Sequence, residues 1–323
     1  MPLVLVPGFL LEGHRSDLER GVAGRAKVID EGGVTEAAGA PDGLEVIVTG
    51  MDDAVFRRAL DAPTVRWVHS TSAGVEHLPL DRMAERGILL TNSAGAYATA
   101  MAEYVIAAAI TLARNLPGWL GGQRERRWLD WDAFGASLLR GKRIGIVGYG
   151  AVGREVASAA RALGMEVWAT KRTPIFPTAE PVDRLLPADA LKELLAASDV
   201  VVLSASLNRS TRTLIGAAEL DTMKPTATLV NVARGGLVDE DALVRALTGG
   251  AIGGAMLDVT REEPLPAESP LWTTPNLFIT PHISGNAPES WDEAVRFLCA
   301  NLDLYLSGSP GSMGNLVDYA AMR

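Results

Sequence analysis

The chain is 323 residues long, and 48% of its residues are hydrophobic while 21% are charged, which predicts a globular protein of about two domains. Its formal net charge is −9, from 30 Lys and Arg against 39 Asp and Glu, which argues against bulk binding to nucleic acid or to an anionic membrane. The single cysteine, Cys299, excludes an internal disulfide and fits a reducing compartment. No Cys/His cluster has metal-ligand spacing, so we expect no metal site.

The first residues, MPLVLVPGFLLEGHRSD, lack a basic lead-in and an obvious cleavage site, and we expect a strand here rather than a signal peptide. The longest apolar stretch, residues 104–113, is too short to span a bilayer and predicts a buried helix. These features predict a cytoplasmic protein that binds no membrane.

Short β-branched runs recur through the first hundred residues. They predict strands at residues 2–6, 26–30, 45–50, 65–70 and 88–92. A long helical pattern follows at residues 98–118 and ends at Pro117–Gly118, and we expect this helix to lead the chain into a second domain.

A second series of strands alternates with helical patterns, and a further long amphipathic helix at residues 290–308 leads the chain back. The predicted strands are residues 143–148, 165–170, 199–204, 227–233, 253–259 and 277–281, and the predicted helices between them are residues 153–164, 188–198 and 239–250. This alternation is typical of parallel α/β sheets, and two series predict two sheets in two domains.

A glycine-rich turn lies between a predicted strand and a predicted helix. Its residues are Gly148, Tyr149, Gly150, Ala151, Val152 and Gly153. The spacing allows a tight turn, a close approach to a pyrophosphate and close packing of the helix on the strand, so it predicts dinucleotide binding. A purely structural turn is the alternative.

The next strand ends in a basic pair where such sites usually carry an acid. Lys171 and Arg172 occupy this position, and the hydroxyl of Thr173 follows them. An acid there favours NAD, whereas a cation accommodates the 2′-phosphate of NADP. We therefore expect NADP, with NAD and two solvated surface cations as the alternative.

Three predicted strands of the second series each end in a candidate reactive side chain. Arg234 follows one strand, Asp258, Glu262 and Glu263 follow another, and His282 follows the last. Reduction of a 2-keto acid needs a proton donor for the carbonyl oxygen and a cation for the carboxylate. His282 suits the first task, because histidine titrates near neutrality, and Arg234 suits the second. A glutamate hydrogen-bonded to His282 would favour its imidazolium form.

Four segments together make the chain similar to the D-isomer-specific 2-hydroxyacid dehydrogenases. They are GKRIGIVGYGAVGREVA, LVNVARGGLVDEDALVRAL, LDVTREEPLPAESPLW and NLFITPHISG. The resemblance implies two Rossmann-like α/β domains with a cleft between them. It also implies a discontinuous, flavodoxin-like substrate domain of residues 1–97 plus 290–323 and a dinucleotide-binding domain of residues 98–289.

The resemblance further implies a catalytic Arg234, Glu263 and His282, with Glu263 preferred over Glu262 because it directly precedes Pro264. Backbone groups near Ala73, Gly74 and Val75 would hold the substrate carboxylate. Asp258 would contact the nicotinamide amide, and Ala233 would belong to the cofactor site. Members of the family are typically homodimers.

Lys171 stands where the family usually has an aspartate, which resembles its NADP-using glyoxylate and hydroxypyruvate reductases. We therefore expect a reductase of small 2-keto acids. An NAD-dependent dehydrogenase of a larger D-2-hydroxy acid or of phosphoglycerate is one alternative. A cofactor-sensing binding protein without enzyme activity, like the corepressors related to these dehydrogenases, is another.

Overall fold

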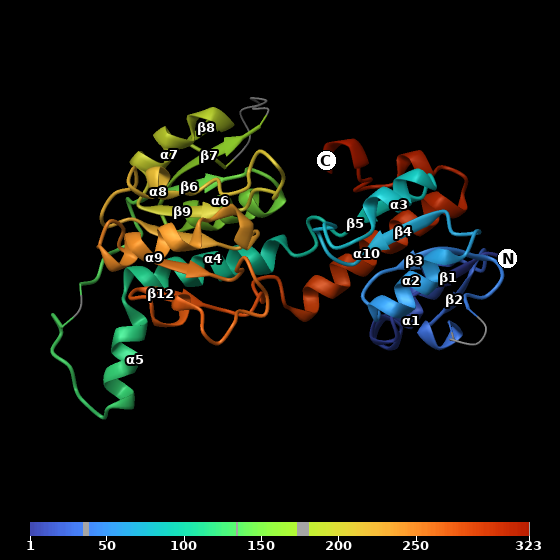
Figure 1. The fold of residues 1–323 in the computed structure, drawn as a ribbon, viewed down its shortest axis with the longest axis horizontal. Helices are drawn as coiled ribbons and strands as arrows, with labels where there is room; N and C mark the ends of the chain where they lie inside the picture. Colours follow the sequence, from blue (N-terminus) through green and yellow to red (C-terminus); the bar gives the residue numbers. More distant parts are fainter. Residues whose placement is uncertain (35–38, 134, 173–180, 323) are drawn as a thin grey trace. The chain divides into compact units, whose positions relative to one another are not determined.

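The computed structural model describes residues 1–34, 39–133, 135–172 and 181–322. The chain forms two units (Figure 1). Unit 1 consists of Met1–Tyr97 and Ala287–Arg323, and unit 2 is the continuous segment Ala98–Asn286. Among the described residues, none of the helices combines the length and the apolar character that crossing a membrane requires.

Unit 1 is built on a five-stranded parallel sheet with the strand order β2-β1-β3-β4-β5. Its strands are β1 (Leu3–Leu5), β2 (Lys27–Ile29), β3 (Leu44–Val48), β4 (Trp67–Ser70) and β5 (Leu89–Asn92). This order is that of flavodoxin-like folds, and it puts the loops that follow β1, β3, β4 and β5 at one edge of the sheet.

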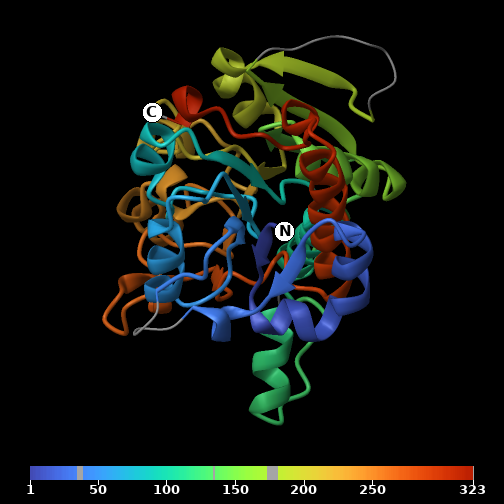
Figure 2. The same cartoon turned by 90° about the vertical axis from the view of Figure 1, so that its right-hand side faces the viewer.

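Helices cover both faces of the unit 1 sheet, because alternate strand residues are apolar on opposite faces. Val46 and Val48 pack with α1 and α10, which lie side by side (Figure 2), whereas Ile47 packs with α2 and α3. The helices are α1 (Gly8–Val22), α2 (Asp53–Asp61), α3 (Leu80–Glu85) and α10 (Pro288–Leu306). Helix α10, near the end of the chain, therefore completes the core that the first strand begins.

Unit 2 is built on a seven-stranded parallel sheet with the order β12-β11-β10-β9-β6-β7-β8, which is a Rossmann-type order with one further strand. The strands are β6 (Arg143–Val147), β7 (Glu166–Lys171), β8 (Arg184–Pro187), β9 (Val200–Leu203), β10 (Thr228–Asn231), β11 (Gly254–Leu257) and β12 (Leu277–Ile279). Two parallel sheets covered by helices confirm the predicted α/β class. Strand β8 was not predicted.

The helices of unit 2 also form two layers. One layer packs α4 and α6 on the sheet through small side chains such as Ala108 and Ala157, and the other packs α7, α8 and α9 on the opposite face. The helices are α4 (Ala98–Ala113), α5 (Leu116–Arg124), α6 (Ala151–Ala162), α7 (Leu191–Ala197), α8 (Ala217–Leu220) and α9 (Glu240–Thr248). Short 3-10 helices occur at Glu31–Gly33, Ala188–Ala190, Gly235–Leu237, Pro270–Thr273, Pro310–Ser312 and Tyr319–Met322.

The helix predicted at residues 98–118 is in fact two helices. Helix α4 ends at Ala113, and Asn115 adopts a left-handed backbone conformation with φ of 46°. Pro117 then lies in the first turn of α5, where its missing N–H leaves no helical hydrogen bond unmade. The prediction that Pro117–Gly118 ends the helix was therefore wrong, because the proline stands at the start of a new one.

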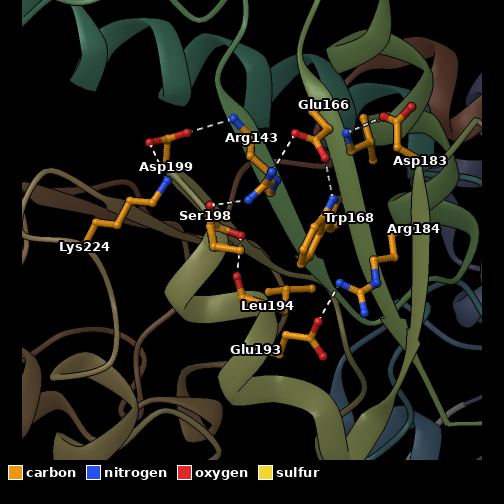
Figure 3. Close-up of polar contacts among 12 residues, drawn as sticks. Arg143, Glu166, Trp168, Asp183, Arg184, Glu193, Leu194, Ser198, Asp199 and Lys224 are labelled. Carbon is orange, nitrogen blue, oxygen red and sulfur yellow. Dashed lines mark hydrogen bonds and ion pairs between the residues drawn. The ribbon is translucent and has the colours of Figure 1, made fainter.

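A polar network holds the amino ends of β6, β7 and β9 together (Figure 3). The Arg143 guanidinium lies 2.8 Å from a Glu166 oxygen and 4.2 Å from the Trp168 ring centroid. Asp199 accepts a hydrogen bond from the Arg143 N–H at 2.8 Å and pairs with Lys224 at 2.9 Å. The hydrogen bond from Arg143 lowers the pKa of the Glu166 carboxyl. These charges stabilise one edge of the sheet, and the candidate site lies at the opposite edge.

Candidate active site

The glycine-rich turn joins β6 to α6 and leaves room for a phosphate. A Cβ on Gly148, whose φ is 100°, would lie 2.5 Å from the backbone nitrogen of Ala205, and one on Gly153 would lie 2.8 Å from the carbonyl of Gly148. By contrast, a Cβ on Gly150 would have no atom within 4 Å apart from those of its two chain neighbours. The first turn of α6 carries no acidic residue and no side-chain cap. These residues fit a dinucleotide, because an open glycine backbone and an uncapped helix N-terminus favour a pyrophosphate.

The rest of the turn provides its support. The side chain of Tyr149 is buried, and its N–H donates to the carbonyl of Thr170 in β7 at 2.8 Å. Ala151 is exposed and Val152 is half-buried. The turn is thus fixed to the neighbouring strand at the point where the basic pair begins.

Lys171 is the last residue of β7, and Arg172 follows it on the surface. Because Val147 pairs with Thr170 in the sheet, both cations lie at the same edge as the glycine-rich turn. Within the part of the chain that the structure describes, neither side chain forms a hydrogen bond or an ion pair. Thr173, also predicted to bind the cofactor, lies outside the described residues.

Three adjacent strands, β10, β11 and β12, bring the other candidate residues to this edge. Arg234 follows β10, Glu263 follows β11 and His282 follows β12. Since the strands are parallel, their carboxyl ends meet at one edge, where ligands bind in open α/β sheets. No group of three or more His, Cys, Asp or Glu side chains suited to a metal ion occurs among the described residues.

Glu263 and His282 form a close polar pair. The Nδ1 of His282 lies 2.7 Å from Oε2 of Glu263, whose Oε1 accepts a hydrogen bond from the N–H of Thr260 at 3.0 Å. About half of the His282 side chain is exposed, so the pair is open to a ligand. A carboxylate oxygen can only accept, so Nδ1 carries the proton and Nε2 is the nitrogen left for chemistry.

Asp258 holds the backbone of the His282 loop. Its carbonyl oxygen accepts from the N–H of His282, its Oδ1 from that of Ile283, and its Oδ2 from that of Ser284, each at 2.8 Å. These bonds fix His282 in a left-handed conformation with φ of 55°, which costs about 1 kcal/mol for a residue with a side chain. Asp258 is 1% exposed. Its predicted contact with the nicotinamide amide stays a prediction.

Tyr104 of α4 adds a further hydrogen bond to the network around Asp258. Its hydroxyl lies 2.5 Å from Oγ1 of Thr280, which donates to Oδ1 of Asp258 at 2.6 Å. Because the Thr280 hydroxyl donates to the carboxylate, Tyr104 must donate to Thr280. Burial raises the pKa of Tyr104 to about 12, so its hydroxyl keeps its proton at neutral pH. Sequence reasoning missed Tyr104 and Thr280, since neither belongs to a recognised catalytic pattern.

The loop that carries Arg234 is packed directly against the loop that carries Glu263. A Cβ on Gly235 would lie 1.9 Å from the carbonyl carbon of Thr260, so only glycine fits there. Asn231, which is fully buried, donates from its side chain to the carbonyl of Arg234 at 3.0 Å, and its own carbonyl accepts from the N–H of Asp258 at 3.0 Å. The Asn231 amide also accepts from the N–H of Ala233, which positions the turn.

In unit 1, the loop after β4 contains Ala73, Gly74 and Val75, the residues predicted to bind the substrate carboxylate. The carbonyl oxygens of residues 70–73 all accept hydrogen bonds. The carbonyls of residues 70 and 72 accept from the hydroxyl and the N–H of Ser93, that of residue 71 accepts from the hydroxyl of Tyr97, and that of residue 73 accepts from the side-chain amide of Asn92. The N–H groups of residues 73–75, in contrast, donate to no residue that the structure describes. A loop whose carbonyls are tied back while successive N–H groups are free suits an anion.

The chain matches the family model described as "D-isomer specific 2-hydroxyacid dehydrogenase, NAD binding domain" over residues 106–284. It is 35% identical over 295 residues to (S)-sulfolactate dehydrogenase of Chromohalobacter salexigens, covering 89% of this chain and 93% of the relative. It is 34% identical over 272 residues to glyoxylate reductase of Thermococcus gammatolerans, covering 82% and 80%.

A solved structure is also similar over the whole length of both chains. It is an NADPH-dependent glyoxylate/hydroxypyruvate reductase of Sinorhizobium meliloti in complex with NADP and sulfate, with a TM-score of 0.82, 25% identity and coverage of 100% of each chain. The family match covers more than half of this chain, and it includes the glycine-rich turn, Arg234, Glu263 and His282. The chain is therefore an oxidoreductase that uses a nicotinamide dinucleotide and belongs to the D-isomer specific 2-hydroxyacid dehydrogenase family.

Proposed function

We propose that this protein is an NADPH-preferring reductase that converts small 2-keto acids of the glyoxylate and hydroxypyruvate type to D-2-hydroxy acids. The observation that carries the reaction is the Glu263–His282 pair, at 2.7 Å, on a loop that Asp258 holds in place. The cofactor preference rests on Lys171 and Arg172 at the end of β7. The S. meliloti relative, which is NADPH-dependent and reduces both acids by its name, supports the same assignment.

In the proposed reduction, His282, Glu263 and Arg234 have different roles. When bound, the nicotinamide supplies a hydride for the carbonyl carbon of the substrate. Nε2 of His282 donates a proton to the carbonyl oxygen as it becomes a hydroxyl, and takes that proton back in the reverse reaction. Glu263 accepts the Nδ1–H bond and stabilises the imidazolium. Arg234 binds the carboxylate and polarises the carbonyl.

In this proposal, unit 2 binds the cofactor and unit 1 contributes to the binding of the substrate. We assign the dinucleotide to unit 2, with the turn from Gly148 to Gly153 at its pyrophosphate and with Ala233 and Asp258 near the nicotinamide. Unit 1 supplies the free N–H groups of residues 73–75 to the substrate carboxylate. Backbone N–H groups of this kind form charge-assisted hydrogen bonds with a carboxylate.

We propose in addition that the protein is a homodimer through an arm formed by residues 116–133 and 135–140 of unit 2. Helix α5 and the segment after it project from the rest of this unit (Figure 1). Five large apolar side chains on the arm are exposed: Leu116, Leu120, Trp128, Trp131 and Leu138. A monomer rarely leaves so much apolar surface in water, and a second copy of the chain would cover it.

Steady-state reduction of glyoxylate and hydroxypyruvate with NADPH and with NADH tests the function. We expect turnover of at least one acid and a clear preference for NADPH. In the double variant Lys171→Ala/Arg172→Ala, the KM for NADPH should rise by about tenfold or more, because two cations leave the 2′-phosphate. The KM for NADH should change little.

Arg245→Ala is the matched control, since it removes an exposed cation of the same unit on α9. Equal losses with NADPH and NADH would show that the pair does not bind phosphate. Turnover of larger 2-keto acids alone, with NADH, would favour the dehydrogenase alternative. No turnover of any 2-keto acid would favour the cofactor-sensing protein.

A further inference from the structure

His69 is a buried histidine that the proposed mechanism does not use. It lies in β4, is 1% exposed, and contacts hydroxyl groups of the adjacent strand β5 and of the segment after it. Its Nδ1 is 2.8 Å from Oγ1 of Thr91, and its Nε2 is 3.2 Å from Oγ of Ser93. Burial lowers the pKa of His69 to about 3, so the imidazole is neutral at physiological pH.

The partners of the two hydroxyl groups determine which nitrogen carries the proton. The Ser93 hydroxyl donates its single proton to the carbonyl of Ser70 at 3.0 Å, so it can only accept from His69. Nε2 therefore carries the proton, and Nδ1 accepts from the hydroxyl of Thr91. In agreement, Oγ1 of Thr91 accepts from the indole N–H of Trp67 at 2.9 Å, because an indole can only donate.

The result is a one-directional series of hydrogen bonds that ends on the substrate loop. It runs from Trp67 through Thr91, His69 and Ser93 to the carbonyl of Ser70, where the loop begins. Ser93 holds the loop a second time, because its N–H donates to the carbonyl of Ser72 at 3.2 Å. The carbonyls of the loop are thereby drawn toward the sheet, and the N–H groups of residues 73–75 are left for a ligand.

We propose that His69 and Ser93 are positioning residues for the substrate: they fix the carbonyls of the loop so that its N–H groups face the carboxylate. This inference rests on the proposed function for its catalytic readout. Neither residue touches the substrate. A neutral imidazole suits this position, since it donates at one nitrogen and accepts at the other.

The test compares three variants with the wild type. Ser93→Ala removes the last link, His69→Leu removes the imidazole, and His69→Gln keeps one donor and one acceptor. The matched control is Thr64→Ala. The Thr64 hydroxyl also donates to a main-chain carbonyl of unit 1, that of Leu44 at 2.7 Å, but at the amino ends of the strands.

We expect Ser93→Ala and His69→Leu to raise the KM for glyoxylate by about tenfold, since a misplaced loop loses one or two hydrogen bonds to the carboxylate. The KM for NADPH should stay within about twofold, because unit 2 binds the cofactor. His69→Gln should recover part of the loss. Thr64→Ala should lower stability without changing either KM. An unchanged KM for glyoxylate in Ser93→Ala would overturn the proposal.

A second readout does not need catalysis. Amide hydrogen exchange, followed by mass spectrometry on peptides that cover residues 70–78, should be faster in Ser93→Ala than in the wild type and in Thr64→Ala. If the wild type reduces no 2-keto acid, the proposed function fails while this measurement still decides the inference. Unchanged exchange in these peptides would contradict it, whatever the activity.

Discussion

At the scale of single residues, the candidate site depends on which carboxylate meets His282. Glu262 and Glu263 are neighbours in the chain and both side chains are exposed, yet the structure pairs only Glu263 with the imidazole. The reason is local. The N–H of Thr260 holds one oxygen of Glu263, and the hydroxyl of Thr260 donates to the carbonyl of Glu262 at 2.7 Å. The loop thus turns one glutamate toward His282.

We predict that Glu263→Gln lowers kcat by about tenfold or more, because an amide cannot stabilise the imidazolium as a carboxylate does. His282→Ala should lower kcat by about 100-fold or more, since the proton donor itself is lost. The binding of NADPH, measured by fluorescence titration, should change little in both variants. The control is Glu262→Gln, which should keep the wild-type kcat. If Glu262→Gln and Glu263→Gln had equal effects, the pairing would be refuted.

At the scale of elements, α4 reaches the His282 loop through one hydroxyl group. We predict that Tyr104→Phe lowers kcat severalfold and stability by about 1 kcal/mol, because Thr280 loses a donor and Asp258 is less firmly anchored. The phenyl ring should keep the packing of α4. Kinetics and urea unfolding measure the two effects.

Tyr305→Phe is the matched control for this prediction. It removes a tyrosine hydroxyl that donates to Glu45 at 3.2 Å. Both of these residues belong to unit 1, whereas His282 belongs to unit 2. Its kcat should equal that of the wild type. A kcat for Tyr104→Phe that also equals the wild type would show that the helix does not position the loop.

The same elements show what could be predicted from the sequence. Buried parallel strands such as β9, whose sequence is VVVL, are runs of β-branched and aliphatic residues, so their positions are clear. Strand β8 is four residues long, begins with Arg184 and ends with Pro187, and such an edge strand carries almost no pattern. The break at Asn115 was also missed, because the apolar pattern continues across it and only the backbone angle reveals it.

In the candidate site, strand ends and motif spacing pointed to Arg234, His282 and a glutamate at position 262 or 263, and the family resemblance favoured Glu263. Their supporting groups were not predictable in the same way. Asn231 and Thr280 act through hydrogen bonds to residues that are distant or ordinary in the sequence, and only the register of β10, β11 and β12 brings them together. Patterns in a sequence report burial and turns, whereas such contacts depend on the fold.

At the scale of the whole molecule, the arm gives a prediction about assembly. We expect light scattering to find two copies per particle for the wild type. In the double variant Trp128→Ser/Trp131→Ser, the particle mass should fall toward that of one chain, because the two most exposed tryptophans leave the interface.

Trp272→Ser provides the comparison, since this indole is also exposed in unit 2 but lies outside the arm. It should leave the particle mass unchanged. A wild type that is monomeric at micromolar concentration would refute the homodimer. A double variant that keeps the mass of the wild type would place the interface elsewhere.

The division of the chain has a consequence for its synthesis on the ribosome. Unit 2 is one continuous segment, so all of its strands and helices have been synthesised before α10 is made. Unit 1 cannot close until then, because Val295, Leu298 and Leu302 of α10 fill the core beside Val4 of the first strand. During translation, this apolar face stays uncovered while some two hundred residues are added. The first part of the protein to be made is thus the last to be protected, and nascent chains are most vulnerable to aggregation there.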